Sequence, residues 1–427
     1  MMDIFDDFIY RELVYQTTSE DLIGIMNHAQ PGEFTCYAGF DPTAQSLHLG
    51  NLIQILLLRR LQSAGMNVIA LVGGATALVG DPSGKMAERS MLDRSTSHDY
   101  LENVRGQIES LLDTSSSTAR IVNNADWLES LNLVQFLREI GKHFTVNQMI
   151  SKESVKQRLA RPEQGISFTE FTYMLLQAYD FLQLYDTYGC RLQTGASDQW
   201  GNITMGVELI GRIRNVIAYG LTTPLLQRAD GSKFGKTEEG TIWLDPSLTS
   251  PYRFYQYLVR VDDSEVVFYL KALTFLSIDE IEDLREKVAK RPEKREAQLA
   301  LAKEVCTLVH GAHTTMQVQA ASNAVYSEDI ASLDDTLFSE IFSDAPHTIL
   351  PRSLLDGGGY DIVDALVASG LSESKSRARV TVDQGGAYVN NHRISSSEHL
   401  IDRSMLLHDR YLLLRRGKRE YHLLEFL

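Results

Sequence analysis

The 427-residue sequence predicts an α/β protein built on a parallel sheet, followed by a helical segment and a small αβ module. Two apolar stretches, residues 34–40 (FTCYAGF) and 66–73 (MNVIALVG), have the pattern of short buried strands, and residues 48–64 between them have that of a helix. A strand, a helix and a strand in this order form a βαβ unit, whose two strands run parallel. Ligands of parallel sheets bind at the carboxyl ends of the strands, here near residues 37–43 and 73–85.

The alternation of helices and strands continues over the next part of the chain. Residues 98–112 and 126–160 have helical patterns, and residues 168–186 form a helix that is too aromatic for a surface element. A strand at 189–194 and a helix at 202–214 complete the α/β region.

The remaining residues have a different character. Residues 228–240 (RADGSKFGKTEEG) form a polar, glycine-containing loop, and residues 251–311 are helical with a break at Arg291-Pro292. Residues 320–360 are rich in Ser and Asp and contain a Gly-Gly-Gly run, which is typical of a linker. A small αβ module ends the sequence.

The composition excludes several classes of protein. It is 44% apolar and 23% charged, as in ordinary globular proteins, and it holds no apolar run long enough to cross a membrane. The N-terminus is acidic and lacks the features of a signal peptide. The three cysteines, at positions 36, 190 and 306, are too few and too scattered for a disulfide framework or a zinc cluster. We therefore expect a cytoplasmic protein with no membrane contact.

The charge is unevenly distributed. The net charge of −15 argues against nucleic acid when it is taken alone, because a polyanion repels an acidic protein. However, residues 371–427 hold 10 Lys and Arg against 7 Asp and Glu, a balance of +3, so that residues 1–370 carry −18. The basic end of the chain is compatible both with simple solubility and with RNA binding.

A first candidate motif is DPTAQSLHLGN, residues 41–51, at the turn from the first strand into the helix. The free N–H groups of a helix start favour phosphate, Thr43 and His48 can donate hydrogen bonds, and Gly50 allows a nucleotide close to the backbone. An ordinary capped turn is the alternative explanation. Neither a P-loop pattern nor G-x-G-x-x-G follows the strand, which disfavours P-loop NTPases and dinucleotide-dependent dehydrogenases.

A second candidate motif lies in the polar loop. Lys233 and Lys236, with Phe234 and Gly235 between them and Thr237 after them, can hold a polyphosphate without rigid secondary structure. Taken alone, these residues fit an exposed basic loop equally well. The presence of both motifs in one α/β region favours a nucleotide site.

Five segments between residues 37 and 237 resemble the bacterial-type tyrosyl-tRNA synthetases of class I, in order and at matching spacing. They are YAGFDPTAQSLHLGN, which is similar to the tyrosyl version of the HIGH motif, LVGGATALVGDPSGK, YMLLQAYDF, LQTGASDQWGNI and KFGKT. The resemblance extends to the C-terminus and implies a Rossmann-like catalytic domain, a helical domain and a small S4-like α+β RNA-binding domain. The implied boundaries are 1–222 for the catalytic domain with an insertion and dimer interface at about 125–160, 223–247 for the KFGKT loop region, 248–325 for a helical anticodon-stem-binding domain, 326–359 for a linker and 360–427 for the S4-like domain.

The resemblance implies an activity: L-tyrosine is activated with ATP to tyrosyl-adenylate and pyrophosphate, and then transferred to the 3′ end of tRNA(Tyr). The residues that match the tyrosine-binding positions are Tyr37 and Asp180 for the phenol hydroxyl, Asp81, Tyr173 and Gln177 for the ammonium, and Gln199 near the carboxylate. Tyr173, Gln177 and Asp180 fall on one face of a single helix, where core packing explains a Gln and an Asp poorly.

The attacking carboxylate and ATP arrive ready to react, so the reaction needs alignment and charge stabilisation more than a side-chain nucleophile. By resemblance, the catalytic positions are Thr43, His48, Asn51, Lys85, Arg89, Lys233 and Lys236. The ATP-binding positions are Asp41, Thr43, His48, Gly50, Asn51, Asp198, Lys233, Lys236 and Thr237. Mg²⁺ is expected to arrive with ATP, and no structural metal is expected.

Three positions depart from the family pattern. Asn51 stands where the family usually has a second His, which puts the strength of a ribose contact in doubt. Ala38 and Ala196 replace a Cys and a Gly of some relatives near the adenosine site.

The partners implied by the resemblance are L-tyrosine, ATP, tRNA(Tyr) and a second copy of the chain. Lys375, Arg377 and Arg379 lie on the expected helix of the S4-like module and are candidates for tRNA phosphate contacts. The homodimer contacts are expected from apolar residues of the insertion: Trp127, Leu131, Phe136 and Phe144.

Three alternatives remain. A tryptophanyl enzyme shares the fold, but the Tyr37 and Asp180 pair suits a phenol. A nucleotidyltransferase that makes a small adenylylated product leaves residues 250–427 without a purpose. A catalytically inactive RNA-binding protein is favoured only by Asn51.

Overall fold

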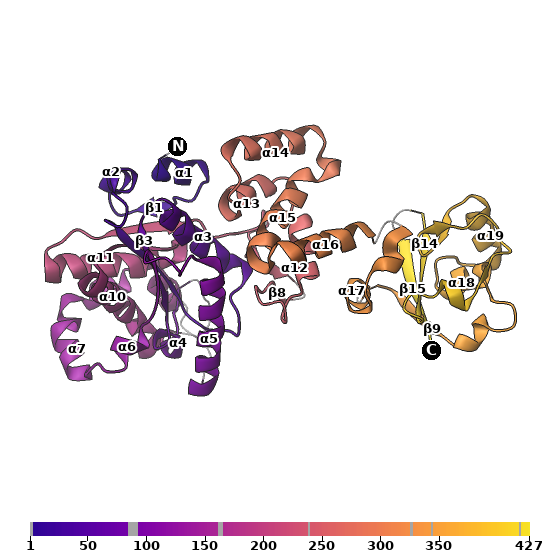
Figure 1. Cartoon of the computed structure of the whole chain (residues 1–427). Coiled ribbons are helices and arrows are strands. Elements are labelled where there is room, and N and C mark those ends of the chain that lie inside the picture. The colour runs from indigo at the N-terminus through magenta and orange to yellow at the C-terminus, as the bar shows by residue number, and fades with distance from the viewer. Residues whose placement is uncertain are drawn as a thin grey trace. The chain divides into compact units, whose positions relative to one another are not determined.

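The computed structural model describes residues 3–83, 93–160, 165–237, 240–324, 328–342, 345–417 and 420–427. The chain divides into two compact units, residues 1–311 and 312–427. Figure 1 traces both units.

A six-stranded sheet forms the centre of the first unit. Its strands, in spatial order, are β1 (Gln16–Thr17), β6 (Tyr219–Thr223), β5 (Cys190–Ala196), β2 (Thr35–Phe40), β3 (Asn67–Val72) and β4 (Ala119–Asn123). All neighbouring strands are parallel except β1, which is antiparallel to β6. The predicted βαβ unit and parallel sheet are confirmed, and the register pairs Tyr37 on β2 with Ile69 on β3 and Gln193 on β5.

Helices cover both faces of this sheet. On one face lie α10 (Phe168–Tyr188) and α11 (Trp200–Arg214), which bury Tyr37, Ile69 and Leu71 of the sheet together with Phe181 and Met205. On the other face lie α3 (Leu49–Ser63) and α5 (Arg94–Leu111), as Figure 1 shows. The short helices α1 (Ile4–Tyr10), α2 (Asp21–His28) and α4 (Thr76–Val79) complete the layer structure.

The two helices that carry the motifs begin and end for local reasons. Ser167 caps the start of α10 by accepting a hydrogen bond from the backbone of Glu170, and Gly189 ends the helix at a φ of 64°. At the start of α3, His48 and Asn51 form a reciprocal capping box. The predicted bounds of both helices therefore lie within two residues of the observed ones.

The insertion between β4 and α10 differs from the predicted helical stretch 126–160. Its described residues hold four short α-helices, α6 (Ala125–Leu128), α7 (Leu133–Glu139), α8 (Val146–Ile150) and α9 (Glu153–Leu159), and a 3₁₀ turn at Gly141–His143. Asn132 and Thr145 each cap a new helix with their side chains, so the polar residues that look tolerable inside one long helix are the starts of separate ones. Strand β4, which precedes the insertion, was not predicted.

The rest of the first unit is helical, as predicted. It contains α12 (Pro251–Val259), α13 (Val266–Leu273), α14 (Ile278–Lys290) and α15 (Glu296–His310), and a short 3₁₀ turn at 292–294 marks the predicted break. Before them, β7 (Lys236–Thr237) pairs with β8 (Gly240–Thr241) next to the KFGKT loop.

The second unit has a five-stranded sheet with the order β12 (His392–Arg393), β11 (Ala387–Val389), β14 (Tyr411–Arg416), β15 (Glu420–Phe426) and β9 (His347–Leu350). The helices α18 (Ile362–Ala368) and α19 (Lys375–Asp383) pack on one face of it. The unit begins with α16 (Ala312–Ala324) and α17 (Asp335–Ile341), and β10 (Tyr360–Asp361) pairs with β13 (Leu400–Ile401).

The stretch 326–359 was expected to be a linker, but it carries α17 and β9. Strand β9 pairs in parallel with β15, so it completes the C-terminal sheet. Asp335 and Ser339, which contributed to the linker pattern, lie within α17 itself.

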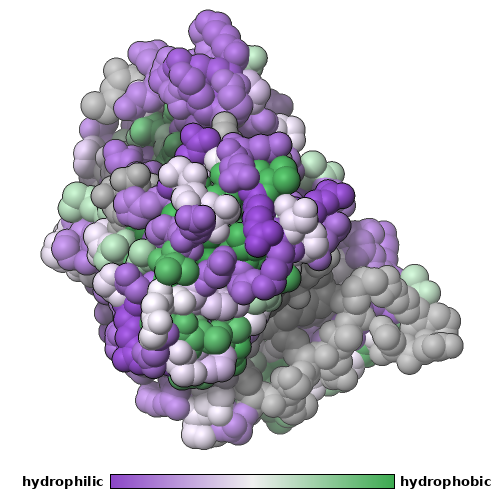
Figure 2. Space-filling model, turned by 90° about the vertical axis from the view of Figure 1, so that its right-hand side faces the viewer, coloured by the Kyte–Doolittle hydropathy of each residue, from purple (hydrophilic) through white to green (hydrophobic). Residues whose placement is uncertain are grey.

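Figure 2 shows one face of the molecule, on which hydrophilic side chains predominate in the described part and hydrophobic ones form smaller groups between them. In the part of the chain that the structure describes, no helix is long and apolar enough to cross a bilayer.

Candidate active site

The carboxyl ends of β2 and β3 meet at a polar junction. Asp41, directly after β2, accepts hydrogen bonds from the Thr76 hydroxyl at 2.7 Å and from the Tyr173 hydroxyl at 2.7 Å. Gly73, directly after β3, leaves room for this junction, because a Cβ there would collide with the Asp41 carboxylate and the Thr76 hydroxyl. The predicted Asp41 and Tyr173 are thus brought into direct contact.

Asp180 on α10 is a buried carboxylate with two neutral donors. Asn124 Nδ2 donates to Oδ2 at 3.0 Å, and Trp127 Nε1 donates to Oδ1 at 2.7 Å. Burial raises the pKa of Asp180 to about 7, and the two hydrogen bonds oppose this increase. Desolvation therefore outweighs hydrogen bonding, and the carboxyl titrates near neutral pH.

These contacts join into one continuous chain of hydrogen bonds. Asn124 Nδ2 also donates to the Thr76 hydroxyl at 2.8 Å, which links the Asp180 pair to the Asp41 junction. The chain runs from Tyr173 on α10 across the ends of β2, β3 and β4 and back to α10. Its members, in order, are Tyr173, Asp41, Thr76, Asn124, Asp180 and Trp127.

Tyr37 lies beside this chain with its hydroxyl unused. Its side chain is 1% exposed, and its hydroxyl oxygen has no hydrogen-bond partner among the described residues. Its ring lies 5.2 Å from that of Phe181, centroid to centroid. Burial, followed by the nearby Asp180 charge, raises the pKa of Tyr37 well above its ordinary value. A buried phenol without a partner is costly for a folded protein, which marks the position as one that a ligand satisfies.

A second polar cluster surrounds Asp81. Gln199 Nε2 donates to Asp81 Oδ2 at 2.6 Å, and Asn202 Nδ2 lies 3.4 Å from Asp81 Oδ1. The same amide nitrogen of Asn202 lies 3.1 Å from Gln177 Oε1, so Asn202 links three of the predicted tyrosine-binding residues. Asp81 also contributes to the raised pKa of Tyr173, after burial and Asp41, which indicates that the two clusters are close.

The two nucleotide motifs pack against each other. The Leu49 N–H at the start of α3 donates to the Ile242 carbonyl at 3.0 Å, and Leu244 N–H donates to the Leu47 carbonyl at 2.9 Å. A Cβ at Gly235 of the KFGKT loop would lie 3.2 Å from Leu49 Cβ, tighter than most real contacts. This glycine, with φ of 82°, therefore permits both the turn and the close approach of the loop to the helix start.

Phe234 anchors the KFGKT loop while its two lysines stay at the surface. The Phe234 ring is 3% exposed and stacks on Tyr269 at 4.0 Å between centroids, and the Gly235 N–H donates to the Tyr257 hydroxyl at 2.8 Å. Lys233 and Lys236 are exposed. The anchored backbone fixes the base of the loop, from which the two exposed lysine side chains extend.

The other residues predicted to bind ATP have different surroundings. Burial and the nearby Asp81 raise the pKa of Asp198, whereas Lys233 lowers it, so this lysine lies close enough to act on the Asp198 carboxylate. Thr43 is half-buried, and its N–H donates to the Asp41 carbonyl at 2.8 Å. Thr237 lies on β7. Lys85 and Arg89 lie outside the described residues.

Asn51 has a structural role that the sequence did not indicate. Its Oδ1 accepts from the His48 N–H at 3.0 Å, and the His48 side chain accepts in return from the backbone of Asn51. Asn51, which replaces the second His of the family motif, therefore caps the helix that carries His48 and Gly50 at its start.

Candidate metal ligands are sparse. Among the residues that the structure describes, there is no group of three or more His, Cys, Asp or Glu residues that could hold a metal ion.

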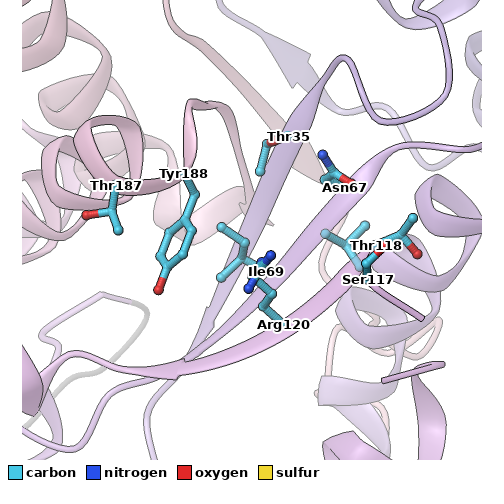
Figure 3. Close-up of a pocket in the computed structure, with 9 residues that line it drawn as sticks. Thr35, Asn67, Ile69, Ser117, Thr118, Arg120, Thr187 and Tyr188 are labelled. Carbon is cyan, nitrogen blue, oxygen red and sulfur yellow. The ribbon is translucent and has the colours of Figure 1, made fainter. Parts of the chain in front are cut away.

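A cavity of about 300 Å³ lies at the opposite, amino-terminal ends of the strands (Figure 3). It is lined by Thr35 and Asn67, the first residues of β2 and β3, and by Arg120 and Tyr188. None of the predicted site residues lines it, so this cavity is separate from the candidate site.

The residues expected at a dimer contact pack at least partly within their own chain, and the dimer contact itself stays a prediction. Trp127 and Phe136 pack against the core of their own unit, and Phe144 is buried within that core. The exposed apolar side chains of the insertion are other residues of α7 and α8: Leu133, Val134, Leu137, Val146 and Ile150.

The predicted tRNA residues lie on α19, as expected of a basic helix. Lys375, Arg377 and Arg379 are all exposed. Lys375 pairs with Asp364 at 2.5 Å, and Arg377 lies 3.9 Å from Glu373.

Sequence reasoning missed Thr76, Asn124 and Asn202, and it assigned Trp127 to a different role. A weak signal for Asn124 and Trp127 existed, because Asn123-Asn124 follows the short, mostly apolar stretch ARIV and Trp127 comes soon after. Had β4 been recognised, its carboxyl end would have pointed to the same edge as Asp41.

Comparison with known proteins agrees with this architecture and site. Residues 29–327 match the family model described as class I tRNA synthetases (W and Y), and residues 338–424 match that of the tyrosine–tRNA ligase SYY-like C-terminal domain. The fold and the arrangement of its two nucleotide motifs thus define a class I tRNA synthetase.

The relatives narrow this class. The chain is 48% identical to the tyrosine–tRNA ligase of Bacillus caldotenax over the full length of both chains. It is 46% identical to that of Roseiflexus castenholzii over 99% of both chains. A truncated mitochondrial tyrosyl-tRNA synthetase from Aspergillus nidulans superimposes with a TM-score of 0.67 at 30% identity, over 76% of this chain and 94% of that one. The chain belongs to the tyrosine–tRNA ligase family.

Proposed function

We propose that Tyr37 and Asp180 select L-tyrosine by its phenol hydroxyl, in a chain that acts as a tyrosine–tRNA ligase. The observation that carries this proposal is the unpartnered, buried Tyr37 hydroxyl beside the buried Asp180 carboxylate. A phenol hydroxyl both donates and accepts, so it can donate to Asp180 and accept from Tyr37. Phenylalanine would leave both groups buried without a partner, which is far more costly than a lost methylene contact.

The ammonium group of tyrosine is held at the other end of the pocket. Asp81 and Asp41 supply negative charge there, and the Tyr173 hydroxyl and the Gln177 amide oxygen supply acceptors. Both carboxylates raise the pKa of Tyr173, which supports a locally negative region that favours a cation.

In the first reaction, a carboxylate oxygen of tyrosine attacks the α-phosphorus of ATP. A bond forms between this oxygen and phosphorus, the bond to the bridging oxygen of pyrophosphate breaks, and its electron pair leaves with pyrophosphate. Both reactants are already in the required charge state, so the enzyme must align them and stabilise charge on the phosphates. The start of α3, with Thr43, His48 and Gly50, offers N–H and side-chain donors for this purpose.

Lys233 and Lys236 neutralise the leaving pyrophosphate, with Lys85 and Arg89 as further candidates. The anchored backbone around Phe234 and the exposed lysine side chains support this role, because the side chains can move onto the phosphates while the loop base stays in place. Mg²⁺ enters as the MgATP substrate.

In the second reaction, a hydroxyl at the tRNA 3′ end attacks the tyrosyl carbonyl and releases AMP.

A tyrosine-dependent exchange of pyrophosphate into ATP tests the specificity. We expect exchange with tyrosine, and with phenylalanine a rate lower by several orders of magnitude, as is established for tyrosine-specific synthetases. Tyr37→Phe should lose discrimination while it keeps the ring volume. Exchange with tryptophan in place of tyrosine would overturn the assignment of Tyr37 and Asp180.

We further propose that tRNA(Tyr) is bound by the helical region 248–325 and by the C-terminal region 360–427. The division of the chain near residue 311 and the separate core of the C-terminal sheet support an independent RNA-binding part. Truncation at about residue 325 should abolish tRNA charging and spare pyrophosphate exchange. Charging by the truncated chain would exclude residues 360–427 as an essential tRNA contact.

A second copy of the chain is the proposed occupant of the apolar face of α7 and α8. Leu133 and Val134 are 71% and 73% exposed, and Val146 is 59% exposed, which is a high exposure for neighbouring aliphatic side chains. Leu133→Asp combined with Val134→Asp should convert a homodimer into a monomer in analytical ultracentrifugation. An unchanged mass would remove this face from the interface.

We assign the activity to the cytoplasm, where ATP and tRNA are available.

A further inference from the structure

The outer face of the C-terminal sheet carries an alternating row of arginine and tyrosine. The register pairs Arg393 on β12 with Tyr388 on β11, Tyr388 with Arg415 on β14, and Arg415 with Tyr421 on β15. Directly paired residues of antiparallel strands project from the same face. The four side chains therefore form a single row across four strands, called here the Arg–Tyr row.

The opposite face of the same strands forms the core of the unit. Ala387, Leu414 and Leu424 point into that core, beneath α18 and α19. The alternation along each strand then directs the Arg–Tyr row away from the core. Tyr421 is 42% exposed, Arg393 is exposed, and Tyr388 and Arg415 are half-buried.

The two central members of the row are in contact. The Arg415 guanidinium carbon lies 4.3 Å from the centroid of the Tyr388 ring. Such a stacked pair presents a flat, cationic surface, and it holds the guanidinium in one orientation. At the far end, the Tyr421 ring meets Phe342 edge-on at 6.2 Å between centroids, which fixes that ring as well.

The charge of the row lacks a carboxylate counter-charge in the part of the chain that the structure describes. Within the described residues, neither Arg393 nor Arg415 forms an ion pair with a carboxylate, and the buried Nε of Arg415 has no hydrogen-bond partner. By contrast, the neighbouring Arg416 pairs with Glu420 at 2.5 Å. The Arg393 side chain is positioned by a hydrogen bond from Nε to the Gly385 carbonyl at 2.9 Å.

A tight hairpin turn sets this arrangement. Asn390 and Asn391, between β11 and β12, have φ angles of 48° and 66°, as a two-residue type I′ turn requires. Leu413 N–H donates to Asn390 Oδ1 at 2.9 Å, which fastens the turn to β14. The register that places Arg393, Tyr388 and Arg415 side by side is therefore fixed by local chemistry.

We propose that the Arg–Tyr row binds an unpaired nucleotide of the tRNA, with its base stacked on the Tyr388 and Arg415 surface and its phosphate held by Arg393 or Arg415. A flat aromatic and guanidinium surface on a sheet suits a splayed base, whereas a helical groove needs a protruding element. This inference rests on tRNA as the partner proposed above and assigns it a mode of contact.

Substitutions within the row separate stacking from charge. Tyr388→Leu keeps an apolar side chain but removes the stacking face, and we expect tRNA(Tyr) to bind roughly 5- to 100-fold more weakly at every salt concentration. Arg415→Gln removes the cation, and we expect weaker binding together with a salt dependence that falls by about one in log–log slope. Tyr388→Phe should bind almost as well as the unchanged chain.

Arg403→Gln is the matched control. Arg403 is an exposed arginine of the same unit that pairs with Asp356 at 2.7 Å and lies off the row. Its substitution removes the same charge and should leave the affinity within about twofold. All variants should keep the wild-type rate of tyrosine-dependent pyrophosphate exchange, which needs no tRNA.

Two results would overturn the inference. The first is that Tyr388→Leu and Arg415→Gln both bind tRNA as tightly as the unchanged chain. The second is that Arg403→Gln and Arg415→Gln lose the same amount of tRNA affinity, which would leave only a general charge effect. If Tyr388→Leu fails to fold, the comparison of Arg415→Gln with Arg403→Gln decides. Failure of the unchanged chain to charge tRNA(Tyr) would instead contradict the proposed function.

Discussion

At the scale of single residues, Asp180 shows why a site cannot be read completely from its own motif. The sequence placed Asp180 on the same helix face as Tyr173 and Gln177, because a helix brings such residues together by its own period. The donors to its carboxylate, Asn124 and Trp127, are more than 50 residues away and reach it only through the strand order. Local periodicity therefore predicts one face of the pocket, and topology supplies the other.

The first prediction concerns the pH dependence of tyrosine use. Because the pKa of Asp180 is about 7 in the folded chain, lowering the pH below 7 protonates it and removes an acceptor for the phenol. We expect kcat/KM for tyrosine in pyrophosphate exchange to rise about tenfold per pH unit below 7 and to level off above it. Asp180→Asn should lower kcat/KM and remove this rise.

The control is Asp186→Asn, on the same helix, where the carboxylate pairs with Arg214 at 2.6 Å. That variant should keep the rise near pH 7. A wild-type profile that is flat between pH 6 and pH 8 would contradict the assigned pKa.

The same group affects stability with a defined sign. The pKa of Asp180 is higher in the folded chain than the ordinary value of 3.8, so the folded state binds the proton more tightly. Its contribution is most favourable below pH 4, and up to about 4 kcal/mol is lost as the pH rises to about 7. Urea unfolding at pH 5.5 and pH 8 should show a smaller difference in unfolding free energy for Asp180→Asn than for the unchanged chain.

At the scale of elements, the long helices and the strands β2, β3 and β5 were predictable, whereas the interior strand β6 and the edge strand β4 were not. Strands β2 and β3 are buried on both faces and have continuous apolar runs. Strand β4 lies at the edge, contains Arg120 and is only partly buried, so its apolar signal is weak. The helix start at His48 was predicted, but the cap contributed by Asn51 depends on side-chain geometry.

Asn51→Ala should have two effects. It removes one half of the capping box of α3, which should lower the unfolding free energy by about 1 kcal/mol, and it should slow adenylate formation while tyrosine binding holds. Asn51→Gln can reach the same backbone N–H, so it should restore stability. Unchanged burst kinetics of adenylate formation in Asn51→Ala would exclude a role for this residue in catalysis.

The insertion is fastened to α10 by a buried ion pair. Arg158 on α9 and Glu170 on α10 are 3% and 2% exposed and lie 2.8 Å apart. Glu170→Gln leaves a buried cation without its counter-charge, so we expect a loss of about 3–5 kcal/mol in unfolding free energy. Arg158→Met combined with Glu170→Leu, which removes both charges, should be much less destabilising. Equal losses in the two variants would show that packing, rather than charge, dominates.

At the scale of the whole molecule, the net charge of −15 averages an acidic first part and a basic end. The quantity that governs RNA binding is the local placement of cations, such as Lys233, Arg393 and Arg415. Binding of tRNA should therefore weaken steeply between 50 and 200 mM salt, by about 10³-fold for six phosphate contacts, whereas tyrosine affinity should barely change. Filter binding and tyrosine titration in the same buffers would measure both, and equal salt dependence would contradict local cation placement.

The hydrogen-bond chain from Tyr173 to Trp127 has a consequence for how this pocket can change. Because Asp41, Thr76, Asn124 and Asp180 each share partners with a neighbour, a substitution at one end alters the donors and acceptors available at the other. The two ends of the chain, which we propose to face the ammonium and the phenol of tyrosine, are thus thermodynamically coupled. A chain that evolved, or was redesigned, to accept another amino acid would have to pass through simultaneous substitutions, since single steps leave a buried polar group without a partner.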